Sequence, residues 1–168
     1  MKLANYYQMQ KVLDTKIEAK FNFKPHETIF HKLLALIVEI GEASNEHRGF
    51  KFWSEDQKPR REKLLAEFVD SWHFAIGVGN SLNIAVEEVE PRLFTSVTKG
   101  TIQTIYRVCQ LTEGYDMELS KHILERRYRV VLEYLLGLGM AYGFTEDEIE
   151  AAYIQKNQEN HERQLNHY

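Results

Sequence analysis

Two pairs of acidic residues share the same spacing, and each pair lies inside a strongly apolar segment. Glu39 and Glu42 belong to the run HKLLALIVEIGEASNE, and Glu67 and Asp70 belong to EKLLAEFVDSWHFAIGVG. Residues three apart on an α-helix project from the same face. Every residue of segment 33–40 except Glu39 is apolar, which predicts a helix that is buried on nearly all sides. The pattern therefore predicts four carboxylates directed into the protein interior from two helices.

Divalent-metal binding is the chemistry that suits four such carboxylates. Burying one ionised carboxylate without a partner costs on the order of several kcal/mol, and segments 33–46 and 64–80 contain no lysine or arginine. Hard cations such as Mg²⁺ take oxygen ligands and are commonly shared with substrate phosphates. Two carboxylate pairs on antiparallel neighbouring helices would converge on one ion or a small cluster. In the alternative interpretation, the acids face solvent on amphipathic helices and bind no metal.

A di-iron centre is a second alternative for the same acids. Such centres in helical bundles use two Glu-x-x-His pairs and two further glutamates. Asp70 and His73 form one carboxylate-x-x-His pair, and no second such pair occurs in a segment predicted to be a buried helix. His73 is therefore predicted to be a core or pocket histidine rather than an iron ligand.

The C-terminal segment carries a polar stripe that could bind phosphate. Lys156, Asn160 and Arg163 are spaced i, i+4 and i+7, so they share one helix face. Lysine and arginine can hold phosphate oxygens, arginine with two parallel hydrogen bonds. A metal on one side of a polyphosphate and basic residues on the other is a common arrangement for phosphoryl chemistry. The alternative is a solvated helix end, where cations also favour the helix dipole.

Aromatic and amide side chains near the acids could contact a nucleobase. Phe74 follows Asp70 by one helical turn and could stack on a base or pack in the core. Trp53 lies in the aromatic segment FKFW before the second acidic helix. Gln10 could bind a base edge through both atoms of its amide, although nothing in its spacing requires it.

Helical periodicity extends over almost the whole chain, and strand-like alternation is nearly absent. Helices are expected over 3–19, 26–47, 60–82, 92–112, 117–142 and 146–165, with a loop over 48–59. Thr145 and Glu148 form a T-x-x-E capping box at the start of the last helix, and Gly143 is expected to end the preceding one. We therefore predict one all-α domain over 1–168, an antiparallel bundle of about six helices.

Composition excludes several classes of protein. The chain has 168 residues, 43% of them hydrophobic, and a net charge of −4, which argues against a protein that binds nucleic acid by neutralising phosphates. The single cysteine, Cys109, cannot form an internal disulfide and is expected to be a buried structural thiol in a reducing compartment. The longest apolar run, 33–38, is too short to span a bilayer, and no signal peptide is recognisable at the N-terminus. A cytoplasmic protein without a membrane or nucleic-acid partner is expected.

Several motifs, spread over nearly the whole chain and in the same order, resemble those of the dimeric all-α dUTPase family. This family belongs to the all-α nucleoside triphosphate pyrophosphatase superfamily, which also contains MazG-type enzymes. The matching segments are MQKVLD (9–14), LLALIVEIGEASNE (33–46), FKFWS (50–54), EFVDSWHF (67–74) and KNQENHERQ (156–164). The paired acids are similar to those of the superfamily, whereas the other segments resemble the dUTPase branch.

The resemblance implies a role for each candidate residue. It implies that Mg²⁺, for which Mn²⁺ can substitute, is bound by Glu39, Glu42, Glu67 and Asp70. It implies a uracil pocket that includes Gln10, Trp53 and Phe74. It implies that phosphates are held by Lys156, Asn160 and Arg163. It also implies a homodimer that converts dUTP, and in some members dUDP, to dUMP. With dUTP the second product is pyrophosphate, released when a metal-activated water attacks the α phosphorus and Glu39 or Glu42 takes its proton.

Three other functions stay open at this point. The nearest is the same chemistry on another nucleotide, such as dCTP or a damaged purine triphosphate, as in MazG-like enzymes. A non-catalytic helical interaction protein, in which the acids form a partner-binding face, is the second. A carboxylate-bridged di-iron oxidase is the third. Substrate profiling, divalent-metal binding and iron content distinguish these functions from a dUTPase.

Overall fold

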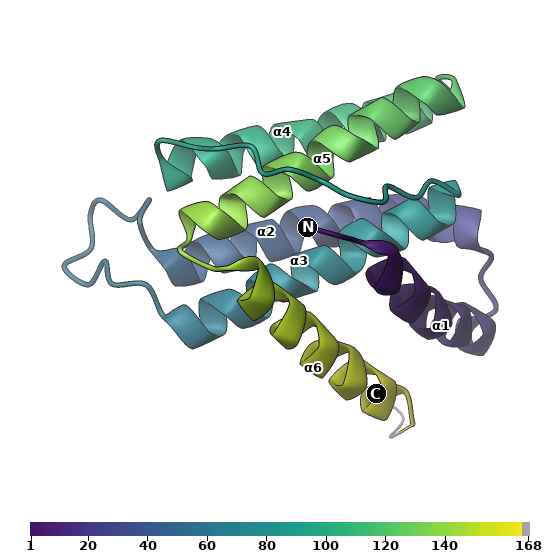
Figure 1. Ribbon diagram of the computed structural model, residues 1–168, viewed down its shortest axis with the longest axis horizontal. Helices are drawn as coiled ribbons and strands as arrows, with labels where there is room; N and C mark the ends of the chain where they lie inside the picture. The colour runs from purple at the N-terminus through teal and green to yellow at the C-terminus, as the bar shows by residue number, and fades with distance from the viewer. Residues whose placement is uncertain (166–168) are drawn as a thin grey trace.

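The computed structural model describes residues 1–165, which form six α-helices and one short 3₁₀ helix. In chain order they are α1 Ala4–Phe21, η1 Pro25–Thr28, α2 Ile29–His47, α3 Arg61–Leu82, α4 Val97–Asp116, α5 Lys121–Ala141 and α6 Glu146–Leu165 (Figure 1). Residues 1–165 contain no strand, and a single isolated bridge joins Lys2 to Glu88. The prediction of an all-α fold with six helices is confirmed. No helix within these residues combines the length and hydropathy needed to cross a membrane.

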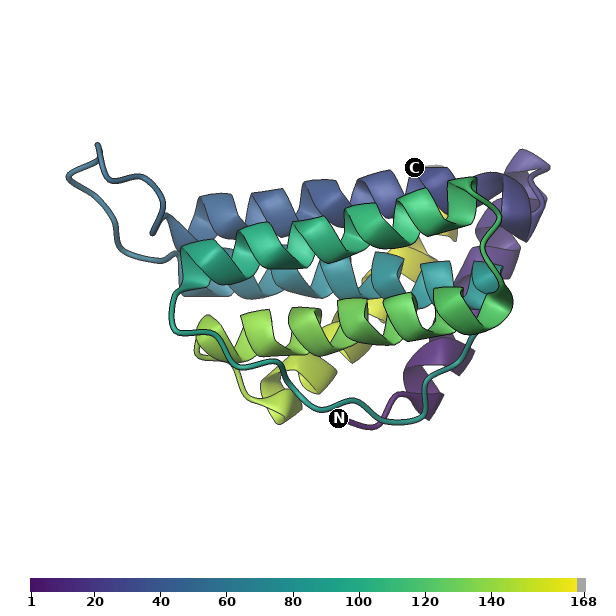
Figure 2. The ribbon, with the colours of Figure 1, turned by 90° about the horizontal axis from the view of Figure 1, so that it is seen from above.

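Four helices lie along one another, and the first and last helices diverge from them. α2 and α3 form one antiparallel hairpin, and α4 and α5 form a second (Figures 1 and 2). α3 is the central element, because it packs against α1, α2, α5 and α6. Segment 83–96 returns along α5 to the start of α4 (Figure 2), and the Arg92 N–H donates to the Glu133 carbonyl at 2.9 Å. The first and last helices, α1 and α6, therefore both pack against α3.

Two helix starts lie several residues later than predicted, at 97 instead of 92 and at 121 instead of 117. The backbone of Ser96 is extended, and its side chain accepts a hydrogen bond from the Lys99 N–H, so Ser96 caps α4. Pro91 therefore lies in the extended return segment instead of beginning a helix. Pro25 begins the short 3₁₀ helix, and the regular α-helix predicted from 26 begins only at Ile29.

The predicted signals at the junction of the last two helices are confirmed. The Glu148 carboxylate accepts from the Thr145 N–H at 2.9 Å, and the Thr145 hydroxyl accepts from the Glu148 N–H at 3.2 Å. Gly143 has a φ of +85°, and the following Phe144 N–H donates to the Gly139 carbonyl at 3.0 Å. This left-handed glycine ends α5 and turns the chain into α6.

The prediction that α2 is buried on nearly all sides is wrong. One face packs in the core through residues such as Leu33 and Leu36, but Phe30, Leu34 and Val38 are 46%, 63% and 46% exposed. These three side chains follow one another at intervals of four, so they form a continuous apolar stripe along the outer face of α2. A run of apolar residues does not distinguish a core from a surface that another molecule covers.

The predicted burial of Cys109 is also wrong. Its thiol is free and exposed on α4. The core-facing positions of the same helix are Val108 and Leu111, which are fully buried. The apolar character of the segment around Cys109 therefore comes from its core-facing neighbours, whereas Cys109 itself faces outward.

Two glycines in helices are expected to respond in opposite ways to replacement by alanine. A Cβ on Gly137 would overlap the backbone carbonyl of Arg92, whereas a Cβ on Gly41 would meet no atom within 4 Å. We expect Gly137→Ala to lower the free energy of unfolding by more than about 2 kcal/mol. Gly41→Ala should raise it by about 1 kcal/mol. Denaturant unfolding of both variants checks this, and equal effects of the two substitutions would contradict it.

Candidate metal and nucleotide site

Three of the four predicted acids meet between α2 and α3. One carboxylate oxygen from each of Glu39, Glu67 and Asp70 lies within 4.8 Å of the other two. The hairpin of α2 and α3 produces this arrangement, because antiparallel neighbours bring the i,i+3 pairs of both helices to the same level. All three side chains are partly buried rather than fully buried.

Glu42 lies outside this group and is exposed. The expectation that all four carboxylates are buried is therefore wrong. Residues three apart differ in direction by about 60° around a helix. Glu42 therefore lies outside the space between α2 and α3, although Glu39 lies within it. Its charge still acts on the group, because it raises the pKa of both Glu39 and Glu67.

The three carboxylates carry more negative charge than their surroundings compensate. Burial raises the pKa of Glu39 to about 7, and the charges of Asp70, Glu42 and Glu67 add to the rise. The pKa values of Glu67 and Asp70 are also raised, in each case first by burial. Such a site favours a cation, and an all-oxygen donor set fits a hard divalent ion such as Mg²⁺.

A cationic partner for these acids comes from α6. The Lys156 Nζ lies 2.5 Å from the Asp70 Oδ2, and both side chains are mostly buried. This partner was not predicted, because Lys156 lies on α6, 86 residues from Asp70 in the sequence. The exposed Arg163, two turns further along α6, also lowers the pKa of Asp70. Asn160, between them, is partly buried. Of the predicted polar stripe of α6, Lys156 therefore contacts the acidic group directly, and Arg163 acts on it through its charge.

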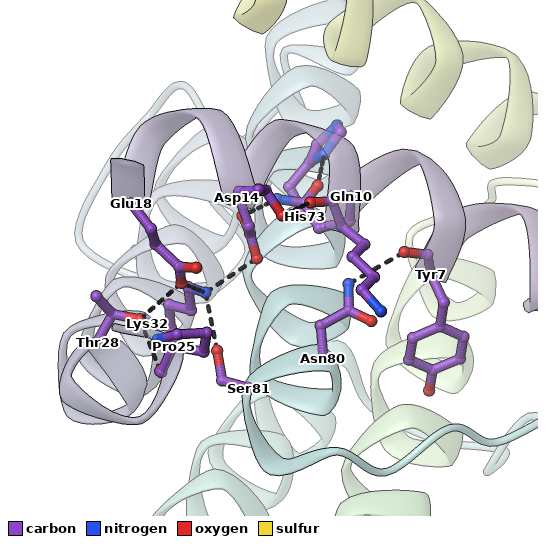
Figure 3. Close-up of polar contacts among 12 residues, drawn as sticks. Tyr7, Gln10, Asp14, Glu18, Pro25, Thr28, Lys32, His73, Asn80 and Ser81 are labelled. Carbon is purple, nitrogen blue, oxygen red and sulfur yellow. Dashed lines mark hydrogen bonds and ion pairs between the residues drawn. The ribbon is translucent and has the colours of Figure 1, made fainter. Parts of the chain in front are cut away.

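Gln10 is buried at the junction of α1, α3 and α6 (Figure 3). Its amide nitrogen donates to the Asp14 carboxylate at 2.7 Å, and its carbonyl oxygen lies 2.8 Å from His73 Nδ1 and 3.2 Å from the Tyr153 hydroxyl. The amide oxygen is thus fully used, and contact with a base through both amide atoms would break existing hydrogen bonds. Sequence reasoning missed Asp14 and Tyr153, although Asp14 follows Gln10 by one helical turn.

His73 lies in the core, as predicted. It is 3% exposed, and its ring stacks on Tyr153 with centroids 3.9 Å apart and planes 13° apart. Burial, and secondarily the charge of Lys156, lower the pKa of His73 to about 3. The ring is therefore neutral at neutral pH. Its Nε2 atom is buried and has no hydrogen-bond partner within residues 1–165.

Of the other two residues expected to contact a base, Phe74 directly follows His73 on α3, whereas Trp53 lies in a distant loop. Phe74 is partly buried and packs against the core. Trp53 is 65% exposed and makes edge contacts with Phe50 and Phe52, at centroid distances of 5.9 and 5.0 Å. Their loop projects beyond the ends of α2 and α3, far from α1 (Figure 1). The loop would have to close over the bundle for Trp53 to reach the same ligand as Gln10.

A groove of about 400 Å³ runs between α1 and α6 and includes Tyr6, Tyr153 and Asn157 in its walls. The Tyr6 hydroxyl and the Asn157 amide nitrogen are buried without a hydrogen-bond partner in residues 1–165. Buried polar groups in this condition are expected to meet water or a ligand. Asn157 was not among the predicted residues.

Comparison with known proteins supports one assignment. A protein-family model described as dUTPase matches residues 2–168. No curated protein matches the chain, and no solved structure does.

Proposed function

Since this chain belongs to the dUTPase family and is a dUTP diphosphatase, we propose that it acts with a divalent cation, Mg²⁺ or in its place Mn²⁺. The proposed ligands are Glu39, Glu67 and Asp70, with Glu42 at the edge of the group. The convergence of three carboxylate oxygens within 4.8 Å, with the pKa of Glu39 raised to about 7, carries this proposal. When bound, the cation would supply a water of lowered pKa and neutralise charge on the polyphosphate.

The protein's own residues would orient the substrate and move the proton. We propose that Glu39 or Glu42 accepts a proton from the water that attacks the α phosphorus. Lys156 and Arg163 would bind phosphate oxygens and stabilise the charge that develops on the leaving pyrophosphate, with Asn160 between them. When the substrate binds, the Lys156 ammonium would leave the Asp70 carboxylate and bind a phosphate oxygen instead, because both are anionic oxygens within its reach.

The base is proposed to bind on the side of α3 that faces α1 and α6. Gln10 contributes from α1 and Phe74 from α3, and Trp53 would join them when its loop closes over the ligand. Support comes from the groove beside Tyr153 and from its unpartnered polar atoms. Steric exclusion at the ribose 2′ position would favour deoxyuridine.

Pyrophosphate release from a panel of deoxynucleoside and nucleoside triphosphates, with Mg²⁺, Mn²⁺ or EDTA, tests the proposal. We expect metal-dependent release from dUTP, loss of release in EDTA, and phosphate release from dUDP. Release from dCTP in preference to dUTP would move the chain to a MazG-like specificity. Release from no nucleotide, together with no divalent-metal binding, would favour a non-catalytic interaction protein.

We also propose that the whole chain acts as one domain and as a homodimer in the cytoplasm. The hydrophobic core is continuous from Met1 to Tyr153, which supports a single domain. The free, exposed thiol of Cys109 suits a reducing compartment. The apolar stripe of α2 is the proposed dimer surface, and the neighbouring α4 carries two further exposed side chains, Ile102 and Tyr106.

Replacing Leu34 with Asp is expected to convert the dimer to a monomer. Leu34 is 63% exposed at the centre of the stripe, so a charge there would be buried unpaired in the dimer, at a cost of about 3 kcal/mol or more. Leu93→Asp is the matched control, because Leu93 is 78% exposed away from the stripe. Light scattering after gel filtration measures the mass, and a wild-type monomer would contradict the proposed surface.

A further inference from the structure

Lys32 joins three helices through one fully used ammonium group (Figure 3). Its Nζ lies 2.9 Å from the Asp14 Oδ2, the Glu18 Oε1 and the Ser81 Oγ. An ammonium has three hydrogens, and a carboxylate can only accept. Each of the three donors of Lys32 therefore has its own acceptor, and the side chains of the ion pairs are almost 90% buried, with exposures of 13% and 11%.

Asp14 transmits this arrangement to Gln10. Its second oxygen lies 2.7 Å from the Gln10 Nε2. The Lys32 ammonium at 2.9 Å opposes the rise in pKa that burial causes in Asp14. In this ion pair the carboxylate accepts on both oxygens, from Lys32 on Oδ2 and from Gln10 on Oδ1. A flipped amide would bring two acceptor oxygens together at this distance. The amide nitrogen must therefore face Asp14, and the amide oxygen must face His73.

The orientation of the Gln10 amide determines which nitrogen of His73 carries the proton. The Gln10 Oε1 accepts from the Tyr153 hydroxyl at 3.2 Å and lies 2.8 Å from His73 Nδ1. An oxygen can only accept from the ring, so Nδ1 carries the hydrogen. In the neutral ring, Nε2 is then a bare acceptor, and it is the buried nitrogen that has no partner within residues 1–165.

Close packing holds the ion pair against the helix that carries His73. Gly77 follows His73 by one turn of α3, and a Cβ on Gly77 would lie 3.0 Å from the Asp14 Oδ2 and 3.5 Å from the Lys32 Cδ. The absence of a side chain at Gly77 lets the pair approach the α3 backbone. Asp14 and Lys32 consequently have little freedom to adopt another arrangement.

We propose that Asp14 and Lys32 are positioning residues for base selection, and that they act through Gln10 to hold His73 with Nδ1 protonated and Nε2 presented as an acceptor. This inference rests on the proposed function for its ligand. The uracil edge offers an N3–H donor, whereas N3 of cytosine is an acceptor. One N–H of the Gln10 amide also remains for a uracil carbonyl. With the His73 Nε2 acceptor at position N3 of the base and the Gln10 N–H at a carbonyl, the pair is complementary to uracil and places two acceptors together in cytosine.

The histidine tautomer can be measured without any substrate. In ¹⁵N-labelled free protein, we expect His73 to show a protonated Nδ1 and an unprotonated Nε2. In Asp14→Asn, the new amide would keep its oxygen toward Lys32 and present N–H to Gln10. The Gln10 amide would then turn over, and the proton of His73 would move to Nε2. The preference for dUTP over dCTP in kcat/KM should fall about tenfold to hundredfold, because a buried acceptor is replaced by a donor.

Glu18→Gln is the matched control. Glu18 lies as close to Lys32 as Asp14 does, at 2.9 Å, but no contact joins it to Gln10. We expect this variant to keep the wild-type tautomer and the wild-type preference. A protonated Nε2 in the wild type, an unchanged tautomer in Asp14→Asn, or an equal effect of Glu18→Gln would overturn the inference. If Asp14→Asn does not fold, the wild-type spectrum decides the tautomer. Absence of dUTP hydrolysis would overturn the proposed function, while the tautomer shift would still test the positioning.

Discussion

Replacing Glu39 with Gln is expected to lower dUTP turnover by about a thousandfold while the helical fold is retained. Glu39 contributes one of the three converging carboxylate oxygens. Burial raises its pKa, and the negative charges of the other acids in the group raise it further. Glutamine keeps the size of the side chain but removes the charge that a divalent cation needs. Pyrophosphate release measures turnover, and far-UV circular dichroism measures the fold.

Metal binding separates a ligand role of Glu39 from a purely structural one. We expect Mg²⁺ to raise the melting temperature of the wild-type protein, and to raise that of Glu39→Gln much less. Glu113→Gln is the control, because Glu113 is an acid on α4 with 65% side-chain exposure and an ion pair to Arg127. Glu42→Gln should also abolish turnover if Glu42 takes the proton, yet keep most of the Mg²⁺ response. Unchanged turnover in both Glu39→Gln and Glu42→Gln would exclude the proposed base.

The parts of the fold and site that depend on spacing along one helix were predictable from the sequence. The i,i+3 pairs and the apolar runs around them placed Glu39, Glu67 and Asp70 on two adjacent helices, and the structure brings their oxygens together. Lys156 was predicted to bind phosphate, but its ion pair with Asp70 was not predicted. That ion pair joins residues 86 apart in the sequence, and it depends on the angle at which α6 crosses α3, which spacing along one helix does not encode.

The buried network around Gln10 was not predictable for a related reason. Asp14, Lys32 and His73 come from three helices, and each looks ordinary within its own segment. Their relation follows only from the three-dimensional convergence of α1, α2 and α3 (Figure 3). Conversely, the exposed face of α2 was predicted to be buried because Phe30 and Leu34 are as apolar as core residues. The hydrophobicity of a segment indicates that it is covered, but not whether the covering residues belong to the same chain or to another molecule.

Acidification is expected to destabilise the protein through His73. Its pKa is lowered from 6.5 to about 3 in the folded state, so between these values the unfolded chain binds a proton that the folded protein excludes. The stability contributed by the neutral ring is fully present above pH 6.5 and is lost as the pH falls toward about 3. The slope from this one group is up to about 1.4 kcal/mol per pH unit. Denaturant unfolding at a series of pH values measures it.

His73→Gln isolates this contribution, because glutamine can still donate to the Gln10 carbonyl but does not titrate. The variant should be less stable at neutral pH, since the ring stacked on Tyr153 at 3.9 Å is lost. Its stability should nevertheless fall less steeply with acidification, by about 1.4 kcal/mol per unit. His122→Gln, at an exposed position on α5, should keep the wild-type slope. Equal slopes in the wild type and His73→Gln would mean that folding does not lower the pKa of His73, which would contradict this prediction.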